Sequence, residues 1–511
     1  MPEAAPAANG SPGNGAPHGT VRRLGINATL YTAGNLVTKG IGFFLTLVLS
    51  WVLAPEEYGV WGIALSAGNL LTVVLGLSMD SAIRQMHVQY SEEERQSLYG
   101  TLLAFWLVVP GLAVLLFDVL GRFGWMDFIP SLPFHPYLRL VAWTSFLTLF
   151  VVASPTIFMT RQEPVWVVRL AVGQACLNAV LVLVFTVLLG WGVVGVLTAY
   201  LICSAVMAAI SVVLILRMSS WKLSSRQLRV ALRFSLPLVP HAASNWVMNL
   251  SDRMIMDRYV PGGFVTQAQI GHYNLGYQFG MLVSTFAMSV NNALFPIVDS
   301  CLHDPERRSR VPALGTYALL LICAAGLGVA LLGGEIIRIA TPEKYHGAAA
   351  VIPWLSLAFV LQGLYFVWSR GTWFSMKTAW MPLITAFAGA LSVVLNIILI
   401  PRLGILAAGI DLAIVLATLA VCNGYLASRV YPIAWEYRRW LQLFATGLAT
   451  FSLGRWAGGV NPWWNVVIET LVVIVLFPAL LVLFGFFTAD EWRTLRAWMG
   501  EKAHGARPPS W

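Results

Sequence analysis

Asn249-Leu-Ser-Asp-Arg-Met-Ile-Met-Asp257 places amide and ionisable side chains inside one long apolar segment of this 511-residue chain. At helical spacing, these side chains continue a polar stripe that starts upstream. Polar groups inside a membrane helix are costly unless they face each other or a wet cavity. The segment therefore predicts a membrane helix with one face toward a water-filled pathway. The residues on that face are His241, Asn245, Asn249 and Asp252, with Arg253 at its edge.

Composition predicts an all-α, polytopic membrane protein. Hydrophobic residues make up 58% of the chain, charged residues make up 11%, and the mean hydropathy is +0.74. These values exclude a soluble globular protein. Apolar segments of about 20 residues or more recur from Asn27 to Phe487, and each could cross a bilayer as a helix. We predict about fourteen spans, with the second over 58–84 and the seventh over 228–257.

Lysine and arginine residues predict the orientation. An even number of spans puts both termini on one side of the membrane, and that side collects 22 of these residues against seven on the other. Because cytoplasmic loops carry the excess of positive charge, both termini are predicted to be cytoplasmic. The same bias accounts for the net charge of +9, so nucleic-acid binding is not predicted.

The chain ends and the cysteines add three expectations. Residues 1–26 are predicted to form a disordered cytoplasmic tail without a signal peptide, because the first 20 residues lack an apolar core. Residues 488–511 are predicted to lie on the inner membrane surface as an amphipathic segment. The five cysteines lack metal-binding spacing, so neither a metal nor a cofactor is predicted.

An internal repeat divides the predicted spans into two lobes. A shift of 214 residues pairs Asn35-Leu36 with Asn249-Leu250, and a shift of 212 pairs Gly59 with Gly271. Nearly equal shifts in adjacent helices indicate duplication, and parallel repeats could rock around a site between them. The predicted units are an N-lobe over 27–216, a C-lobe over 217–428 and two additional spans over 429–487.

The repeat places matching polar groups in both lobes. In the first span, Tyr31 and Asn35 occupy the positions that Asn245 and Asn249 occupy in the seventh. Lys39 and Arg253 then follow at equivalent positions as the next cations along each helix. These residues are predicted to line a cavity between the lobes.

At this point the sequence resembles a known family. Asn249-Leu-Ser-Asp-Arg-Met-Ile-Met256, Ile270-Gly-His-Tyr-Asn-Leu-Gly-Tyr277 and Leu53-Ala-Pro-Glu-Glu-Tyr-Gly-Val-Trp-Gly62 are similar to segments of the Wzx-type polysaccharide flippases of the MOP superfamily. The resemblance implies a bacterial inner-membrane protein. It also implies a flippase that moves a polyprenyl-diphosphate-linked oligosaccharide from the cytoplasmic to the periplasmic leaflet by alternating access, for surface polysaccharide assembly. Membrane lipids, and a polysaccharide polymerase with its chain-length machinery, are the partners implied.

A diphosphate cargo calls for cationic side chains, because its oxygens accept hydrogen bonds from arginine and lysine. Several cations have a second interpretation: Arg84 could pair with Asp80 one turn away, and Arg253 could be neutralised by neighbouring carboxylates. Arg169 and Arg370 could extend to the inner interface. The candidates for contacting the diphosphate are Lys39, Arg84, Arg253, Arg370 and Arg169.

Candidates for ion coupling are the titratable groups in the same segments, namely Asp252, His241 and Asp80, because such groups take up protons or cations in transporters.

Two other functions are alternatives that the residues alone leave open. A cation-coupled drug or metabolite antiporter of the same superfamily would need a cavity dominated by acids. A membrane glycosyltransferase or polymerase would need a gathered catalytic centre, for which the short outer loops offer no paired carboxylates, so no enzyme activity is predicted.

Overall fold

The computed structural model describes residues 18–121, 129–377, 379–459 and 461–488, together with Glu491 and Arg493. Every regular element in these ranges is a helix, which confirms the predicted all-α fold. The predicted amphipathic segment over 488–511 lies almost wholly outside the described residues, as do the side chain of Tyr31 and the whole of residues 1–17.

The helices run from one end of the chain to the other with short connections. The first half contains α1 (His18–Val52), α2 (Pro55–Gly76), α3 (Met79–Gln89), α4 (Glu92–Gly121), η1 (Phe134–Leu138), α5 (Arg139–Thr160), α6 (Pro164–Leu183), η2 (Val184–Leu188) and α7 (Gly192–Met218). The second half contains α8 (Ser225–Ser235), η3 (Leu236–Leu238), α9 (Val239–Tyr259), α10 (Gln267–His303), η4 (Arg308–Arg310), α11 (Val311–Ala340), η5 (Glu343–Ala350), α12 (Ile352–Trp368), α13 (Arg370–Phe374), α14 (Met381–Leu403) and α15 (Ile405–Val430). The chain continues with α16 (Tyr437–Ala457), α17 (Pro462–Leu471), η6 (Val472–Leu476) and α18 (Phe477–Leu483).

Twelve helical segments of the described chain are long and apolar enough to cross a membrane. Helices α9 and α16 are not among these twelve, although each has 21 residues and is therefore long enough to span the hydrocarbon core. Their polar side chains lower their hydropathy. In α9 these are the side chains of the polar stripe. The same polar residues that predict a water-filled pathway therefore make α9 too polar to be recognised as a membrane span from its hydropathy.

Two predicted spans are interrupted in the structure, and helix α1 starts upstream of the predicted first span, at His18. The predicted span over 58–84 breaks into α2 and α3, because Leu77 and Ser78 both adopt left-handed backbone conformations, with φ of 48° and 54°. The predicted span over 228–257 also breaks, at Leu236–Leu238, where Pro237 lies between α8 and α9.

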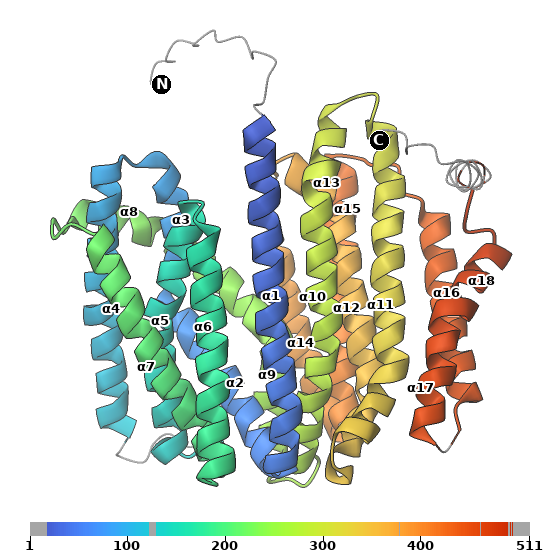
Figure 1. Cartoon of the computed structure of the whole chain (residues 1–511), viewed down its shortest axis with the longest axis horizontal. Coiled ribbons are helices and arrows are strands. Elements are labelled where there is room, and N and C mark those ends of the chain that lie inside the picture. Colours follow the sequence, from blue (N-terminus) through green and yellow to red (C-terminus); the bar gives the residue numbers. More distant parts are fainter. Residues whose placement is uncertain are drawn as a thin grey trace.

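The two halves of the bundle lie side by side (Figure 1). Helices α2–α7 form one half and α9–α15 the other, α1 lies between them in this view, and α16–α18 lie beyond the second half. Helix α1 bridges the halves: a side chain on Gly34 would meet Val168 of α6, and Phe43 packs edge-on against Phe279 of α10 with ring centroids 5.2 Å apart. The division into two lobes at residue 216 stays a prediction.

Candidate functional site

The two halves meet where α2 crosses α10. A Cβ atom on Gly271 would lie 2.0 Å from the carbonyl oxygen of Pro55, and one on Gly59 would lie 2.4 Å from that of Gln267. Both glycines are therefore required for the backbones to approach this closely. In the sequence repeat, a shift of 212 residues aligns Pro55 with Gln267 and Gly59 with Gly271. Equivalent positions of the two halves therefore contact each other at the crossing.

Hydrogen bonds join the halves at the same end of the bundle. Lys344 Nζ and Tyr345 Oη donate to the carbonyl oxygen of Leu53, at 2.8 and 3.2 Å. The backbone N–H of Ser131 donates to Asp257 Oδ2 at 3.1 Å. This end lies opposite the start of α1, so it is the outer end if the predicted topology holds (Figure 1). The structure is thus closed at that end.

Arg253 is buried and not at the edge of a wet face, as the helical spacing had suggested. Its side chain is 3% exposed and that of Asp252 is 7% exposed, and the two pair at 2.9 Å. Arg253 Nε donates to Asn274 Oδ1 at 3.3 Å, and the guanidinium lies over the rings of Tyr273 and Tyr277. The hydroxyl of Tyr273 donates to Asp252. Side chains from α10 therefore bond one atom of each partner of this pair, and the remaining hydrogen bonds come from α9 itself.

A second buried carboxylate lies close to the first. Asp411 on α15 accepts hydrogen bonds from Ser392 Oγ at 2.7 Å and from Asn396 Nδ2 at 2.6 Å, both on α14. It is 1% exposed, its Oδ1 has no hydrogen-bond partner among the described residues, and its helix α15 packs against α9, which carries Asp252.

The predicted polar stripe on α9 exists over its first part. Asn245 Nδ2 lies 3.4 Å from His241 Nε2, and Asn249 Nδ2 donates to the carbonyl oxygen of Asn245 at 2.8 Å. Asn245 is exposed and the other two are half-buried. The stripe is therefore accessible near the start of α9 and buried at Asp252.

Lys39 is exposed on α1, together with Asn35. Nothing lies within 4 Å of the Cβ positions that Gly40 and Gly42 would have, so this stretch of α1 borders open space. Among the described residues, no carboxylate lies within ion-pair distance of Lys39.

Arg84 and Arg169 have partners close to them in the sequence. Arg84 pairs with Asp80 across one turn of α3 at 2.5 Å, and both side chains are well exposed, at 44% and 35%. Arg169 is exposed on α6, and its guanidinium lies 5.5 Å from the centre of the Trp166 ring. Neither contact prevents the arginine from also binding an anion at the surface.

Arg370 is the candidate for which sequence patterns gave the least information. It begins α13, is 8% exposed, and donates to the side-chain oxygen of Asn291 on α10. Its guanidinium lies 4.7 Å from the centre of the Phe295 ring. Within the described chain no carboxylate lies within 4.0 Å of it, although Asp299 on α10 is close enough to act on it electrostatically.

Two cavities lie along α2. The first, of about 220 Å³, is lined by Asp80, Ser78 and Trp106 and reaches Ala242 of α9 in the other half. The second, of about 140 Å³, lies within the first half, and several hydroxyl and amide side chains line it among apolar ones. Sequence analysis missed its polar residues, although Thr144 and Thr148 are one helical turn apart. Those polar residues are Asn69, Thr72, Thr144, Ser145, Thr148 and Tyr200.

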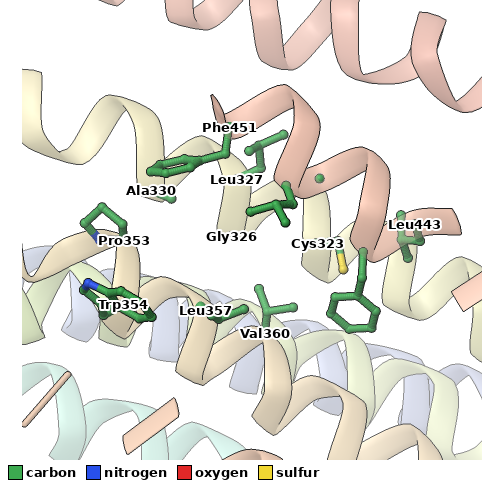
Figure 2. Close-up of a pocket in the computed structure, with 13 residues that line it drawn as sticks. Cys323, Gly326, Leu327, Ala330, Pro353, Trp354, Leu357, Val360, Leu443 and Phe451 are labelled. Carbon is green, nitrogen blue, oxygen red and sulfur yellow. The ribbon is translucent and has the colours of Figure 1, made fainter. Parts of the chain in front are cut away.

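A third cavity has different chemistry. It has a volume of about 230 Å³ and lies between α11, α12 and α16, where Leu327, Trp354, Leu357 and Phe451 are among the residues lining it (Figure 2). Because this lining is almost wholly apolar, the cavity is unsuited to a diphosphate or a sugar.

Within the described ranges, no group of three His, Cys, Asp or Glu side chains is arranged to hold a metal ion.

Comparison with known proteins places the chain in a family. A sequence profile described as polysaccharide biosynthesis protein matches residues 24–300, which is more than half of the chain. The chain belongs to this family. The predicted resemblance is thereby confirmed, and the matched region contains α2, α9, most of α10 and the crossing between the two halves.

Two curated relatives and two solved structures are similar to this family member. The succinoglycan biosynthesis transport protein ExoT of Rhizobium meliloti is 26% identical over 56% of this chain and 56% of its own length. The probable low-salt glycan biosynthesis flippase Agl15 of Haloferax volcanii is 26% identical over 36% of this chain and 39% of its own. The matches thus span about half the length of these relatives, or less.

The solved structures show similarity of fold alone. The lipid II flippase MurJ, in an inward closed conformation, superposes with a TM-score of 0.73 at 15% identity and covers 89% of this chain and 98% of its own. A MATE protein in complex with MaL6 gives 0.54 at 17% identity, covering 80% and 95%. The fold is therefore the polytopic helical bundle that these two structures share.

Proposed function

We propose that this protein is a flippase for polyprenyl-diphosphate-linked oligosaccharides in the bacterial inner membrane, with both termini in the cytoplasm. The names of its relatives support the class of cargo: one is a succinoglycan biosynthesis transport protein and another a probable glycan biosynthesis flippase. On this proposal the polysaccharide polymerase and its chain-length machinery act after transport.

The observation that carries this proposal is the pairing of the charges. Among the described residues Lys39 is exposed without a carboxylate partner and Arg370 makes no ion pair, whereas Asp252 pairs with Arg253. The exposed charge of Lys39 on α1, a helix that contains no aspartate or glutamate, is therefore cationic. Such a surface suits an anionic diphosphate and disfavours the cationic cargo of a drug antiporter.

Alternating access assigns roles to the other groups. With the outer end closed by the α2–α10 crossing, cargo enters from the inner end, where its diphosphate binds Lys39 first. Arg84 and Arg169 attract it from the surface, while His241, Asn245 and Asn249 of the stripe and the hydroxyl-lined cavity along α2 bind sugar hydroxyls. Opening of the crossing then releases cargo to the outer leaflet.

Ion coupling is assigned to the two buried carboxylates. Asp252 and Asp411 are both buried, and a change in the pairing of Asp252 with Arg253 between the two states would couple transport to a proton or cation. Such a coupling works only if the ion binds the two states with different affinity. Asp80 is the less favoured coupling residue, because its carboxylate pairs with Arg84 in an exposed position.

The proposal is tested by substituting Lys39 in cells that depend on this protein for surface polysaccharide. Lys39→Ala is expected to abolish export, since it removes the cation, and Lys39→Arg is expected to retain part of it. Leu36→Ala, an exposed position on the same helix, is the matched control. Normal polymer from Lys39→Ala at wild-type protein levels would remove Lys39 from the cargo site.

A further inference from the structure

The segment that connects the two halves contains an amphipathic helix, α8. One of its faces is fixed to the first half: Gln227, Ala231 and Ser235 are buried. Gln227 Nε2 donates to the carbonyl oxygen of Glu94 at 3.0 Å, and Ser235 Oγ donates to Met79 Sδ at 3.4 Å. Helix α8 is therefore docked on α3 and α4 and is not a free linker.

The opposite face of α8 is exposed and has two stripes. Arg226, Arg229 and Arg233 lie along one stripe, as their spacing of three and four residues dictates, and all three are exposed. Val230 and Phe234 lie beside them, 45% and 40% exposed. No described carboxylate lies within ion-pair distance of any of these arginines. The exposed face therefore combines unpaired positive charge with apolar surface.

The loop that precedes α8 extends this surface. Trp221 is 80% exposed, Leu223 is 58% exposed, and Lys222 lies between them. Figure 1 shows this loop at the outer edge of the first half, level with α8 and near the end of the bundle at which α1 starts. Tryptophan and arginine side chains at such a level are typical of the boundary between headgroups and acyl chains.

The charge of the surrounding sequence identifies the kind of partner. From Pro164 to Ser251, through α6, α7, α8 and most of α9, the chain contains no aspartate or glutamate. The acids of the two helices on which α8 packs are Asp80 on α3 and Glu92, Glu93 and Glu94 at the start of α4, and none of them forms a described ion pair with the α8 arginines. A partner for this surface would therefore supply negative charge and also accept apolar side chains. A leaflet that contains anionic lipids does both, whereas a nucleic acid would leave Trp221, Val230 and Phe234 without apolar contacts.

We propose that the exposed face of α8 and the preceding loop bind anionic lipid headgroups of the inner leaflet. Arg226, Arg229 and Arg233 contact the phosphates, while Trp221 and Phe234 enter the boundary with the acyl chains. Because α8 is docked on the first half and continues through η3 into α9, the bound lipids hold the connection between the halves at the membrane surface. This proposal does not depend on which cargo the protein carries.

The test is tryptophan quenching in reconstituted membranes. The signal of Trp221 is obtained as the difference between the wild-type protein and Trp221→Phe, and brominated lipids quench a tryptophan that they contact. We expect brominated phosphatidylglycerol to quench Trp221 more than brominated phosphatidylcholine at equal mole fraction. The preference should weaken at high salt, because the headgroup contacts are electrostatic.

Two triple variants complete the experiment. The test variant combines Arg226→Gln, Arg229→Gln and Arg233→Gln, and it should remove the preference for the anionic lipid. The control variant removes the same charge from exposed arginines elsewhere at the same end of the bundle, with Arg310→Gln, Arg429→Gln and Arg438→Gln, and it should keep the preference.

Equal quenching of wild-type Trp221 by both lipids would contradict headgroup recognition. Absence of quenching by either lipid would contradict the membrane location altogether and would favour a protein partner. If the test variant does not fold, the salt dependence of the wild-type protein decides: a preference that is unchanged at high salt overturns the proposal.

Discussion

Replacing Arg253 should destabilise the protein through the buried pair that it forms with Asp252. The two side chains are 3% and 7% exposed, so solvent screens their interaction little. Removal of one partner of a buried ion pair costs about 3–5 kcal/mol, because the other charge is left uncompensated. Since Tyr273 still donates to Asp252, we expect Arg253→Met to lose about 3 kcal/mol, at the lower end of this range.

The assay is equilibrium unfolding of the purified protein in mixed micelles, with the free energy of unfolding compared between variants. The double variant Asp252→Asn with Arg253→Met removes both charges, so no buried charge is left uncompensated. It should recover at least about half of the free energy of unfolding that Arg253→Met alone loses. Arg84→Met is the control: its pair with Asp80 is exposed, so the variant should lose less than about 1 kcal/mol. An Arg253→Met protein as stable as the wild type would refute the reasoning.

Three further predictions concern other parts of the molecule. Gly271→Ala should open the outer end, because its Cβ would lie 2.0 Å from the Pro55 carbonyl oxygen, and faster labelling of a cysteine placed at the crossing would report this. Asp411→Asn should make transport independent of an imposed ion gradient, measured in proteoliposomes; transport still driven by the gradient would exclude Asp411 from coupling. Burial lowers the pKa of His87, so its contribution to stability is present above a pH of about 6.5 and should be lost as pH falls below that value toward the lowered pKa; His87→Gln should flatten the pH dependence of unfolding in that window.

Hydropathy and charge bias were sufficient to predict the helical fold, because a bilayer requires long apolar helices. The internal repeat also identified residues at the contact between the halves, because the two glycines that it aligned, Gly59 and Gly271, lie there. The repeat did not predict which polar groups are buried. Arg253 and Lys39 align in sequence, yet only the first is covered by aromatic rings from α10.

Other details of the site depended on tertiary structure. The break after α2 arises at Leu77 and Ser78, residues that rarely adopt left-handed backbone conformations, so no local pattern marks it. The environment of Arg370 depends on Asn291, which lies far away in the sequence. Periodicity can place a side chain on a face of a helix, but it cannot determine which neighbouring helix covers that face.

The central claim, that this protein flips a polyprenyl-diphosphate-linked oligosaccharide through the junction of its two halves, is tested most directly by transport in proteoliposomes. A labelled cargo is incorporated in both leaflets, and its exposure on one side is followed with an enzyme that cannot cross the membrane. We expect wild-type protein to make the protected pool accessible and Lys39→Ala to leave it protected. Equal protection with wild-type protein and with empty liposomes, or unchanged flipping by Lys39→Ala, would contradict the account.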